Sequence, residues 1–256
     1  MVHLKEMFDY LARPCPPERP GSFLVFALRH GESWGQRRNS LYKTMGDDKI
    51  RLTPKGHAQS AASGHILGCL AREWKLPPAR VLASHGERAT QTAQEIHRVL
   101  NSFKYNDASF SNDERLNKQR FGLFDGHFTD EERRSFCPEG FEDYRRQLTE
   151  KGLFHARPPE GESLADVRSR IKNLVDEMKE TGGVYIGVTH GTNVLCLESL
   201  LLGHDEQWII DNMDTLGNCQ IRLMGSDGGK TGAAQNVCLD PSVWSADNPL
   251  NKGPAV

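Results

Sequence analysis

The clearest pattern along the chain is a set of short apolar runs, each followed by polar residues. Residues 23–28 are all apolar, and residues 184–189 form a second, mostly apolar run of similar length. Such runs are typical of buried strands, because the strands of a parallel sheet are covered on both faces. Shorter apolar segments predict further strands at 80–83, at 108–116 and, at an edge of the sheet, at 219–224.

Between these strands, the sequence favours helices. Apolar residues recur at helical spacing, most regularly over residues 163–180. Thr53 and Pro54 suit the first positions of a helix, because threonine caps the free N–H groups and proline fits the first turn. Helices are predicted over 54–73, 87–100, 163–180 and 192–202. Strands that alternate with helices predict an α/β domain with a mostly parallel sheet.

The remaining segments differ in composition from this alternating pattern. Residues 1–21 contain a proline-rich stretch and predict an extended arm, because proline cannot continue a helix. Residues 34–51 are polar and predict a long irregular loop over the sheet edge. Residues 117–160 mix aromatic side chains with dense charge, which favours a helical cap insertion. We therefore expect one domain over 22–224 and an irregular tail at 225–256.

Composition and charge narrow the class of protein. The chain has 256 residues, of which 37% are hydrophobic and 26% charged, and its net charge is −2. These values are typical of a soluble globular protein, and no basic block favours a nucleic-acid or membrane partner. The six cysteines are widely spread without a CxxC pair, which predicts reduced thiols in a cytoplasmic protein. No spacing typical of metal ligands is found, so we expect neither a metal nor another cofactor.

Three predicted strand ends carry a histidine followed by a glycine. The histidines are His30, His85 and His190, and Arg29 and Arg88 lie close to them in the sequence. Parallel strands place their carboxyl ends on one edge of the sheet, where ligands of open α/β sheets bind. Imidazole and guanidinium groups gathered there predict a site for a phosphate-like anion, because the planar guanidinium matches phosphate with paired donors.

Six ordered motifs carry a resemblance to a known family. They are Arg29-His30-Gly31-Glu32-Ser33; Leu52-Thr53-Pro54-Lys55-Gly56 with Gln59; Ser84 with Arg88-Ala89 and Thr92-Ala93; Arg115-Leu116-Asn117 with Phe121-Gly122; Pro159-Glu160-Gly161-Glu162-Ser163 with Asp166; and Thr189-His190-Gly191. Over roughly residues 22–224, the chain resembles the histidine phosphatase superfamily, also called phosphoglycerate mutase-like. The long loop before Leu52 and the Gly217-Asn218-Cys219 segment are similar to its broad-range phosphatase branch. The resemblance implies a three-layer α/β/α sandwich.

The resemblance also implies a role for each residue of the anion site. His30 would be the nucleophile that takes the phosphoryl group, and water would then hydrolyse the phosphohistidine. Arg29, Arg88 and His190 would hold the phosphoryl oxygens, and Ser33 would be a further phosphate contact. The family chemistry requires no metal.

One position departs from the family pattern. Where the family usually has a glutamate that protonates the leaving oxygen, this chain has Lys118. A lysine with its ordinary pKa is a poor proton donor at neutral pH, although it could bind an anionic group of the substrate. Glu114, four residues upstream, and then His85 are the candidates to replace the acid, and each also fits an ordinary surface or loop position.

Three functions remain open on the sequence. The first is a metal-independent phosphatase that acts on a small phosphorylated metabolite, weakened by the change at Lys118. The second is a non-catalytic relative that uses the pocket to bind a ligand or a partner. The third is an enzyme in which Lys118 serves a different reaction. The identity of the substrate and the oligomeric state, a homodimer included, are open as well.

Overall fold

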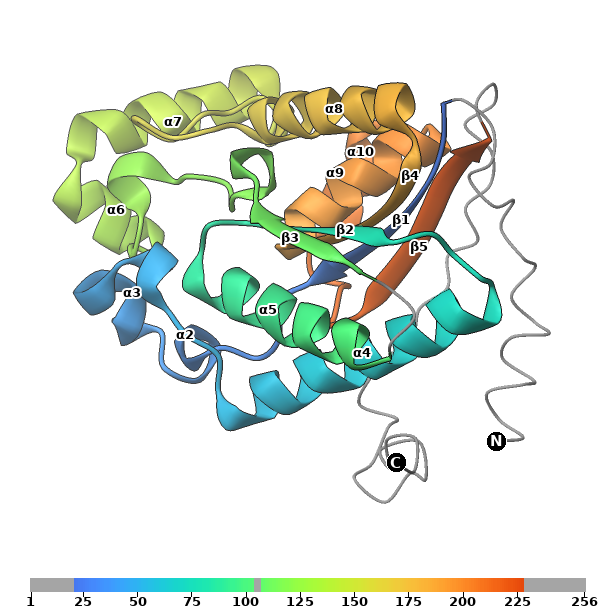
Figure 1. The fold of residues 1–256 in the computed structure, drawn as a ribbon. Helices are drawn as coiled ribbons and strands as arrows, with labels where there is room; N and C mark the ends of the chain where they lie inside the picture. Colours follow the sequence, from blue (N-terminus) through green and yellow to red (C-terminus); the bar gives the residue numbers. More distant parts are fainter. Residues whose placement is uncertain (1–20, 104–106, 228–256) are drawn as a thin grey trace.

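The computed structural model describes residues 21–103 and 107–227, and within them five strands form one sheet. The strands are β1 Ser22–Arg29, β2 Ala79–Ala83, β3 Ser109–Asn112, β4 Gly183–Thr189 and β5 Ile221–Asp227. Their order is β3-β2-β4-β1-β5, and only the pairing of β5 with β1 is antiparallel (Figure 1). The predicted arm, up to residue 20, and the predicted tail, beyond residue 227, lie outside the described residues.

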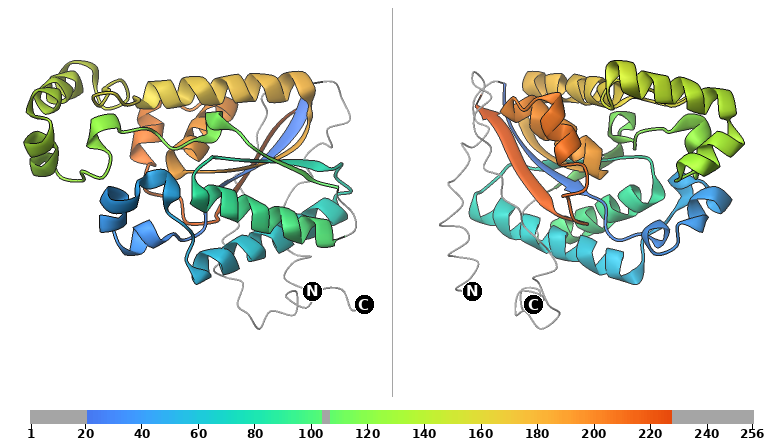
Figure 2. Two further views of the ribbon diagram at one scale, coloured as in Figure 1. Left: turned by 60° about the vertical axis from the view of Figure 1, so that its left-hand side comes forward. Right: turned by 180° about the vertical axis from the view of Figure 1, so that it is seen from behind.

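Helices cover both faces of this sheet (Figures 1 and 2). The helices on one face are α4 Pro54–Glu73 and α5 Glu87–Ser102, and those on the other are α8 Leu164–Thr181, α9 Gly191–Leu202 and α10 Glu206–Asp211. Alternate side chains of β1 enter the two cores, Phe26 on the side of α4 and α5 and Val25 on the side of α8 and α9. The predicted three-layer α/β/α sandwich with a mostly parallel sheet is confirmed.

The central pair of strands brings two histidines together. In the parallel ladder between β1 and β4, Arg29 is paired with Thr189. The next residues, His30 and His190, therefore lie side by side at the same edge of the sheet, directly after these neighbouring strands. The backbone N–H of His30 donates to the carbonyl of Thr189 at 2.9 Å, so the ladder continues into the site.

Two glycines let the chain after β1 pass close to the start of α4. A Cβ atom at Gly31 would lie 2.5 Å from the carbonyl oxygen of Gly56, and one at Gly56 would lie 2.1 Å from that of Glu32. Thr53 caps α4 as expected, because its hydroxyl accepts a hydrogen bond from the N–H of Gly56 at 3.1 Å. This close packing fixes the loop that carries His30.

The prediction of an irregular loop over 34–51 is wrong. This segment contains the short helices α2 Trp34–Arg37 and α3 Ser40–Met45 and the 3-10 turn η1 Asp47–Lys49. Most of its side chains are exposed, so it has no amphipathic period that would reveal helices. The predicted strand over 108–116 is also too long, because Asp113 caps a second 3-10 turn, η2 Glu114–Leu116.

Short helices form the insertion, as the sequence predicts. They are η3 Gly122–Phe124, α6 Asp130–Phe136 and α7 Pro138–Lys151. Phe124 contacts the rings of Phe141 and Tyr144, which gives the insertion a small core of its own. Figure 1 shows α6 next to α3, and an ion pair of 2.6 Å joins Lys43 to Glu132 there. At the other boundary, β5 runs to Asp227, beyond the domain end expected at residue 224.

Candidate active site

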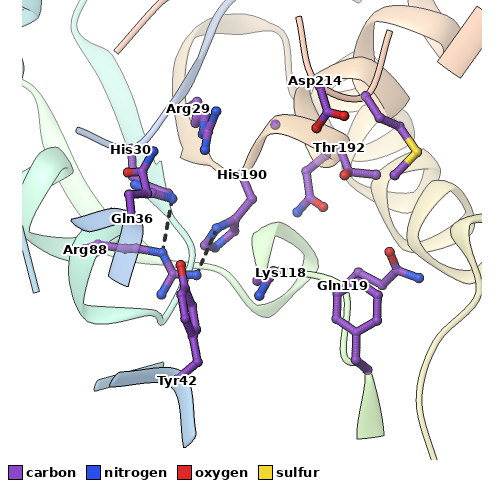
Figure 3. Close-up of a pocket in the computed structure, with 14 residues that line it drawn as sticks. Arg29, His30, Gln36, Tyr42, Arg88, Lys118, Gln119, His190, Thr192 and Asp214 are labelled. Carbon is purple, nitrogen blue, oxygen red and sulfur yellow. Dashed lines mark hydrogen bonds between the residues drawn. The ribbon is translucent and has the colours of Figure 1, made fainter. Parts of the chain in front are cut away.

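A small pocket opens at the carboxyl ends of β1 and β4. Its volume is about 190 Å³, and Arg29, His30, Arg88, Lys118 and His190 all line it (Figure 3). Sites for drug-sized ligands begin at roughly 300 Å³, so this pocket suits a compact ligand. As predicted, these cations and imidazoles lie together at one edge of the sheet.

His30 has one defined tautomer. Its ring is buried, and Nδ1 lies 2.8 Å from the carbonyl oxygen of Gly31, which can only accept a hydrogen bond. Nδ1 therefore carries the proton, and Nε2 accepts a hydrogen bond from Arg88 Nε at 3.1 Å. Burial, and next the charge of Arg88, hold the pKa of His30 well below its ordinary value of 6.5. Nε2 is thus an unprotonated nitrogen whose lone pair accepts the hydrogen bond from Arg88.

His190 has the opposite tautomer. Its Nδ1 lies 3.5 Å from Arg88 Nη2, which can only donate, so Nε2 carries the proton and donates to Ser84 Oγ at 3.0 Å. The Ser84 hydroxyl then donates to Asn117 Oδ1 at 3.3 Å. Burial, and next the charge of Arg88, lower the pKa of His190 as well. The ring is neutral here, and an anion bound beside Nδ1 would favour its protonation.

Arg88 connects these groups. Its side chain is 2% exposed, and Figure 3 shows its guanidinium reaching both imidazole rings. Arg29 approaches from the end of β1, where Nη1 donates to the carbonyl oxygen of Leu216 at 2.8 Å. Because one nitrogen of Arg29 is held by the backbone, its charge is fixed at the pocket. Fixed guanidinium groups of this kind stabilise phosphoryl charge without reorganisation.

Lys118 faces the same pocket, and its charge is paired. Its Nζ donates to Asp47 Oδ1 at 2.8 Å and lies over the rings of Tyr42 and Phe121, at 5.3 and 5.5 Å from their centroids. The other oxygen of Asp47 accepts from Arg88 Nη2, also at 2.8 Å. The carboxylate of Asp47 therefore bridges two cations of the pocket. Burial raises the pKa of Asp47, but the charges of Arg88 and Lys118 outweigh it and lower the pKa below its ordinary value.

Three predicted site residues do not reach the pocket. Ser33 is fully buried at the start of α2, where its N–H donates to Gln36 Oε1 at 3.1 Å. His85 is exposed, and its backbone N–H is held by Asn117 Oδ1 at 2.8 Å. Glu114 is exposed on η2. None of the three is among the lining residues, because each side chain leaves its strand end or turn in another direction.

Sequence reasoning missed four polar residues that line or bridge the pocket, Tyr42, Asp47, Gln119 and Asp214, and one apolar lining residue, Met213. Asp47 lies in the segment predicted as irregular, where an Asp-Asp pair gives no signal beyond surface charge.

In residues 21–103 and 107–227, no group of three or more His, Cys, Asp and Glu side chains is arranged to hold a metal ion. No helix in the same ranges has the length and apolar character that crossing a bilayer requires. The described cysteines, Cys69, Cys137, Cys196 and Cys219, are free thiols.

Comparison with families and curated proteins gives consistent matches. A family model described as the histidine phosphatase superfamily (branch 1) matches residues 25–235. The phosphoglycerate mutase-like protein AT74H of Arabidopsis thaliana is 26% identical over 224 residues, which are 78% of this chain and 73% of the relative. The phosphoglycerate mutase-like protein AT74 of the same plant is 28% identical over 240 residues, 86% of this chain and 71% of the relative.

Solved structures with the same fold include two from bacteria. YhfR of Bacillus stearothermophilus has a TM-score of 0.61 at 20% identity, over 86% of this chain and 98% of that chain. A mycobacterial glucosyl-3-phosphoglycerate phosphatase in complex with VO3 has a TM-score of 0.54 at 22% identity, over 79% of this chain and 90% of that chain. At these identities the likeness concerns the fold alone.

Proposed function

The chain belongs to the histidine phosphatase superfamily, and we propose that it is a metal-independent phosphatase that hydrolyses a small phosphorylated metabolite through a phosphohistidine on His30. The observation that carries this proposal is the tautomer of His30. The hydrogen bond from Nδ1 to the Gly31 carbonyl leaves Nε2 unprotonated, and its lone pair becomes available for attack once the hydrogen bond from Arg88 Nε is released. A neutral imidazole nitrogen is a nucleophile at neutral pH without a separate base.

In the first step, Nε2 of His30 attacks phosphorus and the bond from phosphorus to the ester oxygen breaks. Arg29 and Arg88 meet the charge on the phosphoryl oxygens. Arg88 Nε, which donates to Nε2 before the reaction, becomes free to donate to a phosphoryl oxygen once Nε2 is bonded to phosphorus. His190 adds a third contact, and the phosphate favours the charged form of its ring.

In the second step, water attacks the phosphohistidine and the bond between nitrogen and phosphorus breaks. Inorganic phosphate leaves, and His30 returns to its neutral form. The Gly31 carbonyl supports both steps, because it keeps the proton on Nδ1 and stabilises the positive charge of the phosphorylated ring. His30 is thereby restored for the next substrate.

Two features support a small anionic substrate. The pocket volume of about 190 Å³ leaves room for little beyond a phosphate and a short organic group. Lys118 lies between the rings of Tyr42 and Phe121 and is held by the pocket's own carboxylate, so it can turn to a second anionic group of the substrate. A cytoplasmic location fits such a metabolite and stays a prediction.

A binding protein without catalysis is the second candidate, and two observations favour it. Asp47 already occupies a donor of Arg88, and Lys118 stands where the family usually has its acid. A chain with these features could bind a phosphorylated ligand and hydrolyse it at a negligible rate. The two candidates differ in one measurable event, the transfer of phosphorus to His30.

The test is turnover of p-nitrophenyl phosphate together with labelling of the protein from a radioactive acyl or aryl phosphate, quenched in alkaline denaturant because the nitrogen–phosphorus bond of phosphohistidine hydrolyses in acid. We expect turnover and base-stable label in the wild type and neither in His30→Ala. His85→Ala is the matched control, because His85 is an exposed histidine of the same sheet edge. Absence of both turnover and label in the wild type would refute the phosphatase function and leave the binding protein.

A further inference from the structure

Asp47 bridges the pocket in a way that the steps above do not use. Its two carboxylate oxygens accept hydrogen bonds from Arg88 Nη2 and Lys118 Nζ, each at 2.8 Å. Its side chain is only 15% exposed, so the carboxylate faces these donors rather than solvent. A negatively charged oxygen therefore occupies a donor on Arg88 that a phosphoryl oxygen would need.

The other acidic groups near the pocket are less well placed. Asp214 lines the pocket but is exposed, and its charge acts on Arg29. Asp125, like Asp47, is not among the lining residues, and its side chain is exposed, whereas Asp47 is ion-paired with Arg88 and Lys118. Tyr42 lines it, but burial raises the pKa of its phenol above the ordinary value of 10.0. Of the described residues, Asp47 is the carboxylate that contacts both Arg88 and Lys118.

The backbone at Asp47 is anchored separately from its carboxylate. Its carbonyl oxygen accepts a hydrogen bond from Arg88 Nη1 at 2.6 Å and one from the N–H of Ile50 at 3.4 Å. Ile50 is 1% exposed, so the end of this turn is packed into the protein. The side chain of Asp47 can therefore rotate off Nη2 while its backbone stays against Arg88. A phosphate held by Arg88 would then lie next to a carboxyl group.

We propose that Asp47 is the proton donor to the leaving oxygen, a role that rests on the proposed phosphatase function. The arriving phosphate takes Arg88 Nη2, and the displaced carboxylate, now beside a dianion, binds a proton from solvent. As His30 Nε2 bonds to phosphorus and the ester bond breaks, this proton moves to the ester oxygen and gives the alcohol. Water then cleaves the phosphohistidine, both of its protons leave with the phosphate as H₂PO₄⁻, and Asp47 stays ionised until the next substrate arrives.

Charged groups from several elements face Asp47. Arg88 on α5 and Lys118 after η2 lower its pKa against the effect of burial. Tyr42 on α3 and Asp125 after η3 also interact with its charge, and the pKa of each is raised, chiefly by burial. Before a substrate binds, Asp47 is ionised at neutral pH. Its protonation requires the negative charge that the phosphate ester brings, so the acid forms only when substrate is bound.

Asp47→Asn tests the proposal, because the amide keeps the shape of the side chain and cannot transfer the proton. We expect turnover of an alkyl phosphate, glycerol 2-phosphate, to fall roughly 100- to 10,000-fold. Turnover of p-nitrophenyl phosphate should fall by a much smaller factor, because its leaving group needs no proton. Asp48→Asn is the matched control on the next, exposed residue and should leave both substrates unaffected. Asp47→Glu should restore part of the alkyl turnover.

Two results would overturn the role of Asp47. One is an equal loss on both substrates in Asp47→Asn, which is what a purely structural residue gives. The other is a loss selective for the alkyl substrate in Asp125→Asn rather than in Asp47→Asn. Titration calorimetry with inorganic phosphate adds an independent readout: Asp47→Asn should bind phosphate more tightly than the wild type, and unchanged affinity would contradict displacement. If the wild-type protein is labelled on His30, the proposed phosphatase function stands, even where the results for Asp47→Asn contradict the role of Asp47.

Discussion

Lowering the pH from about 7.5 to about 5.5 should destabilise the protein through His30 and His190. Both rings are neutral in the folded state, where they are 5% and 6% exposed and where burial and Arg88 hold each pKa well below 6.5. In the unfolded chain the same rings take up protons below about pH 6.5. The unfolded state then binds more protons than the folded state, so the free energy of unfolding falls as the pH falls.

The size of the effect follows from the proton balance. A histidine that stays neutral in the fold loses about 1 kcal/mol of stabilisation for each pH unit below its unfolded pKa. At pH 5.5 the two rings together therefore remove about 2 to 3 kcal/mol. That is a large part of the 5 to 15 kcal/mol typical of a folded domain. Exposed carboxylates contribute little to this change, because they titrate mostly below pH 5.

Urea unfolding followed by circular dichroism at several pH values measures this effect, in buffers without phosphate because phosphate binds the folded state. The variant His30→Gln/His190→Asn keeps a hydrogen-bonding side chain at both positions, and neither amide titrates. We expect its pH dependence to be shallower than that of the wild type by the amount above, while His85→Gln, at an exposed position, matches the wild type. Equal pH dependence in the wild type and the double variant would refute the burial of neutral rings.

Three further predictions concern single substitutions. Gly56→Ala should lower the free energy of unfolding in urea by roughly 1 to 3 kcal/mol, because the new methyl group would lie 2.1 Å from the carbonyl oxygen of Glu32. Lys118→Glu should raise the turnover of glycerol 2-phosphate relative to p-nitrophenyl phosphate, because a second carboxylate beside Asp47 raises the pKa of the pair. Arg88→Lys should lower kcat for p-nitrophenyl phosphate roughly 100- to 1,000-fold, because an ammonium cannot reach both imidazole rings at once.

Matched controls separate these effects from general damage. Gly187→Ala adds the same methyl group in β4, where no atom lies within 4 Å of the new carbon, and should cost little. Lys151→Glu reverses an exposed charge on α7 and should leave the substrate ratio unchanged. A stable Gly56→Ala, an unchanged ratio in Lys118→Glu or full activity in Arg88→Lys would each contradict its prediction.

The central strands and the positions of His30, His190 and Arg88 could be predicted from the sequence for a physical reason. A strand buried on both faces must be apolar throughout, so β1 and β4 are visible as runs, and the polar residues that follow them must lie at the sheet edge. This places His30 and His190 side by side, as the pairing of Arg29 with Thr189 confirms. Arg88 follows for the same reason, since the helix after β2 starts at that edge.

The rest of the site could not be predicted because it depends on where side chains point. Ser33 and His85 hold the expected positions along the chain, but one is turned inward as a helix cap and the other outward to solvent. Asp47 lies in a one-turn helix that is stabilised by Arg88 and Lys118, far away in the sequence, rather than by any local period. Contacts of that kind leave no trace in the order of polar and apolar residues.

The sides of the pocket are built from two segments that also bind each other. Residues 34–50 supply the lining residue Tyr42 and also Asp47, which is bonded to Arg88 and Lys118, and residues 117–160 supply Lys118. Outside the pocket, the rings of Tyr42 and Phe128 pack with their centroids 5.5 Å apart, and an ion pair joins Lys43 on α3 to Glu132 on α6. A graft of either segment alone from a relative would leave unmatched surfaces on the other. Substrate preference in this fold should therefore be transplanted, and inherited, as a pair of segments on an unchanged sheet.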